Sequence, residues 1–139
     1  MASILIVEDE PFTREVAGMC LEDWGHRAFF ADGIGSALAI LRSSQLIDGL
    51  FTDINLNGAS AGGLDVAREA IALHPNLKVL YTSGNQETDQ LRSLYVSGAH
   101  FLGKPYTPDQ LRIGIDILLG ASHLRPSPKQ GGEFSGTAS

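Results

Sequence analysis

The fold of this chain is decided by one short stretch near its start, Ile4-Leu5-Ile6-Val7-Glu8-Asp9. Its first four residues are apolar without any polar alternation, which predicts a strand that is buried on both faces. Strands of this kind lie at the centre of parallel sheets that helices cover on both sides. Two acidic residues follow at once, at the point where the predicted strand ends.

Further apolar runs follow in the sequence, and helical patterns separate them. The runs cover residues 28–30, 50–52, 77–81 and 99–102. Apolar residues recur at helical spacing around residues 16–24, 37–41, 64–71, 91–95 and 111–119. This alternation predicts an α/β fold, with a five-stranded parallel sheet and helices on both faces.

Length and composition indicate one domain followed by a tail. The chain has 139 residues and a formal net charge of -6, without the Lys and Arg clusters of a nucleic-acid-binding surface. Cys20 is the only cysteine, which excludes an internal disulfide and is typical of a reducing cytosol. No signal peptide or membrane span is recognisable, so we expect a cytoplasmic domain over residues 1–120. Residues 121–139 are rich in Ser, Gly and Pro, and we expect a disordered tail there.

Chemically active side chains follow the predicted strands. Ligands bind beyond the carboxyl ends of the strands in an open parallel sheet, so these residues should converge at one edge. They are Glu8, Asp9, Asp53, Thr82, Ser83, Lys104 and Pro105. Three converging carboxylates repel one another, which favours a bound cation, and carboxylate oxygens select Mg²⁺. With an ammonium group and a hydroxyl nearby, the set predicts phosphoryl transfer to a carboxylate.

This set of residues, in register with the predicted strand ends, resembles the receiver domain of two-component response regulators. The resemblance covers residues 3–119 and leaves out only the tail. It implies a flavodoxin-like sheet of the receiver type with strand order 2-1-3-4-5. Because no output domain follows in the sequence, we expect a stand-alone, single-domain regulator.

The resemblance assigns a role to each acidic residue. Asp53 would be the phosphoacceptor. Asp9 would bind Mg²⁺ directly, and Glu8 would bind it directly or through water. Asp53 itself and the backbone carbonyl of Asn55 would complete the protein ligands.

The resemblance also assigns roles on the last two strands. Thr82 would hydrogen-bond the phosphoryl group, and Lys104 would pair with it. The peptide bond between Lys104 and Pro105 would be cis, which suits a turn that aims the ammonium group inward. Phe101 matches the rotating aromatic switch residue of the family, although an aromatic at a strand end is more often part of the core.

A domain of this family is a phosphoacceptor switch and not an enzyme, apart from its self-catalysed phosphorylation and dephosphorylation. The resemblance implies that a sensor histidine kinase or a histidine phosphotransfer protein supplies the phosphoryl group. We expect the signal to pass on by contact with an unknown downstream protein. The sequence does not decide whether the chain forms a homodimer. We expect no nucleic-acid and no membrane partner.

One loop departs from the family pattern. Residues 54–63, which follow the phosphoacceptor, read Ile-Asn-Leu-Asn-Gly-Ala-Ser-Ala-Gly-Gly. This loop lacks the usual Pro-Gly pair and is about two residues longer. Because it borders the site, it could alter how the phosphoryl group exchanges with a partner or with water.

Three other functions compete with this hypothesis. A phosphatase of the haloacid-dehalogenase type would need a general acid two residues after its nucleophile, where this chain has Asn55. A flavodoxin-like electron carrier would need a phosphate loop after the first strand, and Glu8-Asp9 would repel the flavin phosphate. We reject both. A receiver-like adaptor that is not phosphorylated remains the alternative.

Overall fold

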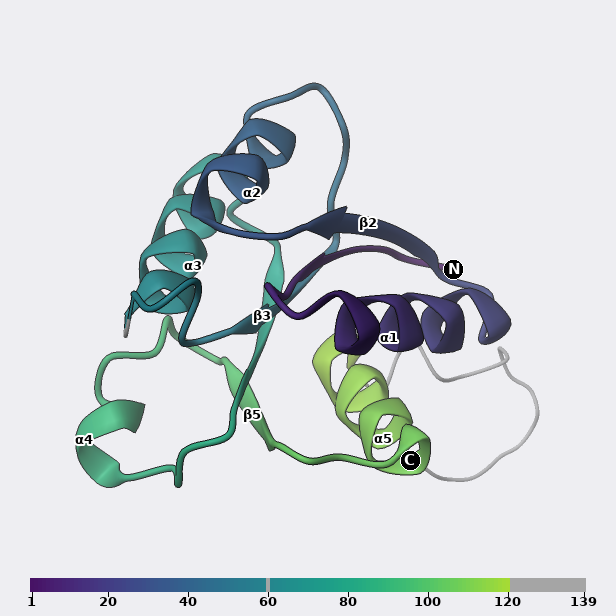
Figure 1. The fold of residues 1–139 in the computed structure, drawn as a ribbon. Helices are drawn as coiled ribbons and strands as arrows, with labels where there is room; N and C mark the ends of the chain where they lie inside the picture. Colours follow the sequence, from purple (N-terminus) through teal and green to yellow (C-terminus); the bar gives the residue numbers. More distant parts are fainter. Residues whose placement is uncertain (60, 121–139) are drawn as a thin grey trace.

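Strands and helices alternate along the chain in the computed structural model, which describes residues 1–59 and 61–120. The strands are β1 (Ser3–Val7), β2 (Arg27–Ala31), β3 (Gly49–Asp53), β4 (Lys78–Ser83) and β5 (His100–Gly103). The helices are α1 (Pro11–Asp23), α2 (Ile34–Leu41), α3 (Gly62–Leu73), α4 (Asp89–Arg92) and α5 (Pro108–Leu119). The strands form one parallel sheet in the order β2-β1-β3-β4-β5, which confirms the predicted fold. Figure 1 shows this sheet between its covering helices. The tail expected over residues 121–139 lies outside the described residues.

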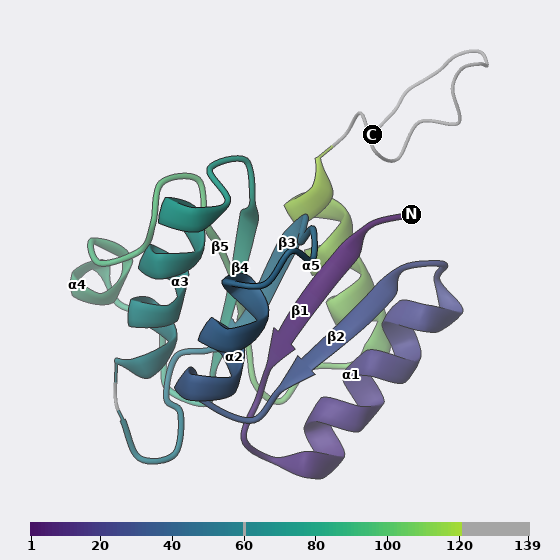
Figure 2. The same cartoon turned by 90° about the horizontal axis from the view of Figure 1, so that it is seen from above.

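Helices cover both faces of the sheet, with α1 and α5 on one face and α2 and α3 on the other (Figure 2). The central strand β1 contributes side chains to the hydrophobic core on both faces of the sheet. Ile4 and Ile6 belong to the core under α1 and α5, whereas Leu5 and Val7 belong to the core under α2 and α3. None of these four side chains is more than 1% exposed. The prediction that this strand is buried on both faces is therefore confirmed.

The parallel register brings the carboxyl ends of the central strands to one edge. Val7 of β1 pairs with Thr52 of β3, and Asp53 of β3 pairs with Thr82 of β4. The side chains that end or follow these strands therefore share one edge of the sheet.

Helix α4 is shorter than the sequence predicts. The apolar residues Leu91, Leu94 and Tyr95 predict a helix through residue 95, but α4 ends at Arg92 and Leu94 is 50% exposed. The backbone N–H of Val96 donates to the Tyr81 hydroxyl at 3.2 Å instead of to a helical carbonyl. The amides of Leu94 and Tyr95 already donate to carbonyls three residues back, those of Leu91 and Arg92, so the α-helical pattern ends before this tertiary bond.

Helix α1 contacts the sheet through a narrower face than predicted. It buries Ala17, Gly18 and Leu21, whereas Val16 of the predicted apolar stripe is 36% exposed. Gly18 receives the ring of Phe30 from β2, which lies 2.3 Å from where a Cβ would stand. This close approach explains why the buried face is centred on the small residues. Among the described residues, no helix is both long and apolar enough to cross a bilayer.

Candidate functional site

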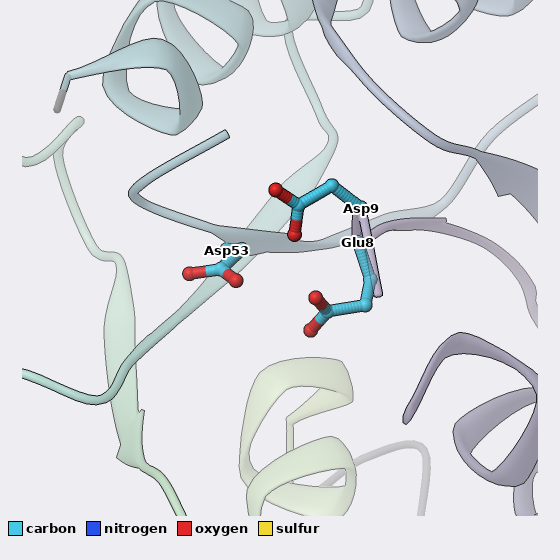
Figure 3. Close-up of side chains that lie close together, drawn as sticks. All are labelled: Glu8, Asp9 and Asp53. Atoms are coloured by element: carbon cyan, nitrogen blue, oxygen red, sulfur yellow. The ribbon is translucent and has the colours of Figure 1, made fainter. Parts of the chain in front are cut away.

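Three carboxylates meet at the edge where β1 and β3 end (Figure 3). Glu8 and Asp9 follow β1 directly, and Asp53 is the last residue of β3. One carboxylate oxygen from each lies within 4.8 Å of the others. The sequence prediction that these acids converge is confirmed by this geometry.

Lys104 ties two of the three acids together. Its Nζ donates to Asp53 Oδ2 at 2.7 Å and lies 2.8 Å from Glu8 Oε1. The backbone N–H of Lys104 donates to the carbonyl of Ser83, which fixes the start of the loop after β5. The peptide bond between Lys104 and Pro105 is cis, as expected.

Burial sets the electrostatics of this site. Glu8 is 4% exposed and Asp53 is 6% exposed. Burial raises the pKa of the Glu8 carboxyl, and the hydrogen bond from Lys104 only partly offsets that effect. Burial alone would lower the pKa of Lys104, but its hydrogen bonds to Asp53 and Glu8 outweigh burial and raise it. Three acids against one ammonium group leave an excess of negative charge, which suits a divalent cation with oxygen ligands.

Asp9 and Asn55 complete the predicted metal ligands. Asp9 is half-buried, and its Oδ2 accepts a hydrogen bond of 2.9 Å from the backbone N–H of Asn57. Asn55 is also half-buried and lies two residues beyond the end of β3. Both residues therefore stand at the edge that carries Asp53.

Thr82 presents a hydroxyl without a partner. The side chain is 2% exposed, and within the described residues its Oγ1 has no hydrogen-bond partner. Leaving such a group unpaired costs about 1–3 kcal/mol, so buried hydroxyls normally have partners. Because Thr82 lies beside Asp53 in the strand register, a phosphoryl oxygen on Asp53 would supply the missing acceptor.

Phe101 of β5 lies in a row of aromatic rings that also includes Tyr81, the residue before Thr82 on β4. Its half-buried ring stacks on Tyr95 with centroids 6.5 Å apart, and Tyr95 in turn contacts Tyr81 at 4.5 Å. The hydroxyl of Tyr95 donates to Glu87 Oε2 at 3.0 Å. The row connects β4, the loop after α4, and β5.

The sequence did not reveal two residues that hold the acids in place. Arg14 Nη1 donates to the backbone carbonyl of Glu8 at 2.9 Å. Asn57 holds Asp9 across a separation of 48 residues. The pair Asn57-Gly58 does indicate a tight turn, but no local sequence signal shows that this turn hydrogen-bonds to Asp9.

A hollow of about 490 Å³ adjoins the site on the side of Lys104. Its walls come from the start of α1, from the residue that follows β4 and from the loop between β5 and α5. They are formed by Phe12, Thr13, Val16, Gly84, Lys104, Pro105 and Tyr106. Phe12 is 71% exposed, so this wall presents apolar surface to any molecule that binds at the site.

Comparisons with known proteins agree with this geometry. The family model described as the response regulator receiver domain matches residues 4–116. A response regulator receiver protein from Sinorhizobium medicae aligns with a TM-score of 0.76 and 30% identity, over 85% of this chain and 94% of that one. The receiver domain of the hybrid histidine kinase CckA aligns with a TM-score of 0.70 and 28% identity, over 84% and 98% of the two chains.

Curated relatives are longer than this chain. The nitrogen assimilation regulatory protein NtrX of Azorhizobium caulinodans is 33% identical over 125 residues, which cover 88% of this chain and 27% of NtrX. A "Probable transcriptional regulatory protein" of Picosynechococcus is 31% identical over 136 residues, which cover 92% of this chain and 53% of the relative. The sensor histidine kinase AruS of Pseudomonas aeruginosa is 32% identical over 114 residues, 78% of this chain and 11% of AruS. The chain thus spans about half or less of each relative.

Proposed function

This chain belongs to the response regulator receiver domain family, and from that premise we propose that Asp53 accepts a phosphoryl group and so switches the domain. Receiver domains act as signalling switches with histidine kinases or phosphotransfer proteins, and not as enzymes with turnover on small substrates. The observation that carries the proposal is the bridge from Lys104 to Asp53 and Glu8 beside the unpartnered hydroxyl of Thr82.

The proposed reaction moves a phosphoryl group from a histidine to a carboxylate. A carboxylate oxygen of Asp53 attacks phosphorus in line, and the P–N bond to the donor histidine breaks. The bonding electrons stay on the imidazole nitrogen, which takes up a proton from solvent. Lys104 pairs with the negative oxygens of the group in transfer, and Thr82 donates its hydroxyl to one of them. The product is an aspartyl phosphate.

The acidic group fits the Mg²⁺ that receiver domains typically bind. Glu8, Asp9, Asp53 and the backbone carbonyl of Asn55 would hold the ion, since hard oxygen ligands and excess negative charge are what it selects. When bound, the ion offsets the negative charge of the carboxylates and of the transferring oxygens. The hydroxyl of Thr82 supports the adjoining phosphoryl position, because it has no hydrogen-bond partner among the described residues.

The hollow beside Lys104 supports a protein as the phosphoryl donor. A phosphohistidine must bring its phosphorus to Asp53, and Lys104 belongs both to the site and to the wall of the hollow. The exposed ring of Phe12 offers apolar contact to the surface around that histidine. We therefore assign this side of the site to a histidine kinase or phosphotransfer protein.

Phosphorylation of Asp53 can be tested directly by intact mass after incubation with acetyl phosphate and Mg²⁺. The parent should gain one phosphoryl group, and Asp53→Ala should gain none. Asp65→Ala is the matched control, because Asp65 is an exposed acid on α3 whose partner is Arg68, and it should be phosphorylated like the parent. Equal uptake by Asp53→Ala would refute the proposal, and no uptake by the parent would favour the unphosphorylated adaptor.

A further inference from the structure

The longer loop after Asp53 contains a miniature hairpin. Leu56 and Ala59 exchange both backbone hydrogen bonds, at 3.1 and 2.8 Å. The two residues between them, Asn57 and Gly58, have φ angles of 51° and 82°. Positive φ at both central positions defines a type I′ turn, for which Asn-Gly is the favoured pair. Leu56 is 1% exposed and anchors the hairpin in the core.

The tip of this hairpin contacts one acid of the site. The backbone N–H of Asn57 donates to Asp9 Oδ2 at 2.9 Å. The other carboxylate oxygen, Oδ1, accepts no hydrogen bond from the described residues, so a cation can use it. Without the bond from Asn57, repulsion from Glu8 and Asp53 would favour rotation of the Asp9 carboxylate toward solvent.

The side chain of Asn57 anchors the hairpin to a third loop. Its Nδ2 donates to the backbone carbonyl of Asp32 at 3.2 Å, between β2 and α2. This anchor is itself fixed, because Ser36 Oγ bonds both the backbone N–H and the carboxylate of Asp32. Gly33 makes the necessary room, since a Cβ there would lie 2.6 Å from Asn57 Nδ2.

From this chain of contacts we infer that Asn57 is a positioning residue that clamps Asp9 in its metal-binding orientation. The side chain holds the hairpin against the Asp32 carbonyl, and the backbone N–H then holds Asp9. Orienting a ligand before the ion arrives lowers the cost of binding, so the clamp strengthens Mg²⁺ binding. The inference deepens the proposed function, on which its metal-binding part rests.

Gly33→Ala tests the clamp without changing Asn57 or any acid. Gly33 has extended backbone with φ of -176°, so alanine is tolerated there, and its methyl group would displace the Asn57 amide. Mg²⁺ affinity measured by calorimetry should fall about two- to tenfold, as expected for the loss of one hydrogen bond. Gly35→Ala, in the first turn of α2 just after the N-cap Gly33, is the matched control, because a Cβ there meets nothing within 4 Å. Its affinity should equal that of the parent.

A double-mutant cycle separates the clamp from a general loss of stability. Asn57→Gly keeps the backbone N–H and accepts the positive φ, but it removes the amide that Gly33→Ala would displace. It should weaken Mg²⁺ binding as much as Gly33→Ala does, and the double variant should be no weaker than either single one. Additive losses would overturn the clamp, and so would affinities equal to that of the parent.

Hydrogen exchange of the Asn57 amide, followed by NMR without Mg²⁺, decides the inference independently of the metal. The amide should exchange faster in Gly33→Ala than in the parent and in Gly35→Ala. Unchanged exchange would overturn the clamp. Absence of Mg²⁺ binding by the parent would refute the proposed metal site instead, so the two failures are distinguishable.

Discussion

The two sides of Asp53 are built differently. On one side, α3 follows the loop after Asp53 and buries six of its residues, and Gly63 lies directly against the backbone of Asp53. On the other side, β4 leads to α4, which has four residues and buries none of them. Asp53 thus stands between a tightly packed region and a sparsely packed one.

This difference separates two tasks. The packed side, together with the Asn57 hairpin, can hold the acids in fixed positions for the cation. The sparse side carries the unpartnered hydroxyl of Thr82 and the ring row that includes Phe101. Regions with few buried contacts open and rearrange at low cost, so we expect the response to phosphorylation on this side. A phosphoryl group would then bias two arrangements of the same segment.

The largest expected effect is on the packed side, at Gly63. An added Cβ would lie 2.0 Å from the backbone oxygen of Asp53, so the start of α3 must move. Gly63→Ala should lower the free energy of unfolding by about 1–3 kcal/mol or more, measured by urea denaturation. Gly84→Ala is the control on the sparse side, where a Cβ meets nothing within 4 Å. If both variants are equally stable, the contrast between the two sides is wrong.

Smaller effects on stability are expected at two buried threonines, and the two effects should differ in sign from each other. Thr52 of β3 donates its hydroxyl to the Asp53 carbonyl at 2.9 Å, whereas the Thr82 hydroxyl has no partner among the described residues. Thr52→Val should therefore destabilise the unphosphorylated protein by about 1 kcal/mol. Thr82→Val should be neutral or stabilising by about 1 kcal/mol, because it removes an unpaired buried group. Thermal denaturation of the two variants checks the sign, and destabilisation by Thr82→Val would show that its hydroxyl is satisfied.

The smallest effect, visible in NMR shifts, concerns the readout of the phosphoryl group. Beryllofluoride with Mg²⁺ mimics that group and should shift amide resonances from Gly84 through Phe101, while amides of α3 change little. Thr82→Ala should still take up phosphate at Asp53, but more slowly than the parent, because one donor to the group in transfer is lost. It should also reduce the distant shifts, because the hydroxyl that senses the group is missing. Shifts in α4 equal to those of the parent would show that Thr82 does not relay the signal.

Much of the fold was predictable because its signals are local. The unbroken apolar run of β1 requires burial on both faces, and the acids, hydroxyl and ammonium group follow strands whose ends a parallel sheet must align. The end of α4 was not predictable in this way. Residues 91–95 keep helical spacing, but the next backbone N–H, that of Val96, donates to the hydroxyl of Tyr81 on β4.

The sequence by itself determined the sheet and the identity of the converging groups. Only the tertiary structure decided which atoms meet. Lys104 bridges Asp53 and Glu8, and Asn57 reaches Asp9 across 48 residues of chain. The physical reason is that periodicity and turn chemistry act between near neighbours in the sequence. Hydrogen bonds between loops depend on how the packed strands and helices place the ends of those loops in space.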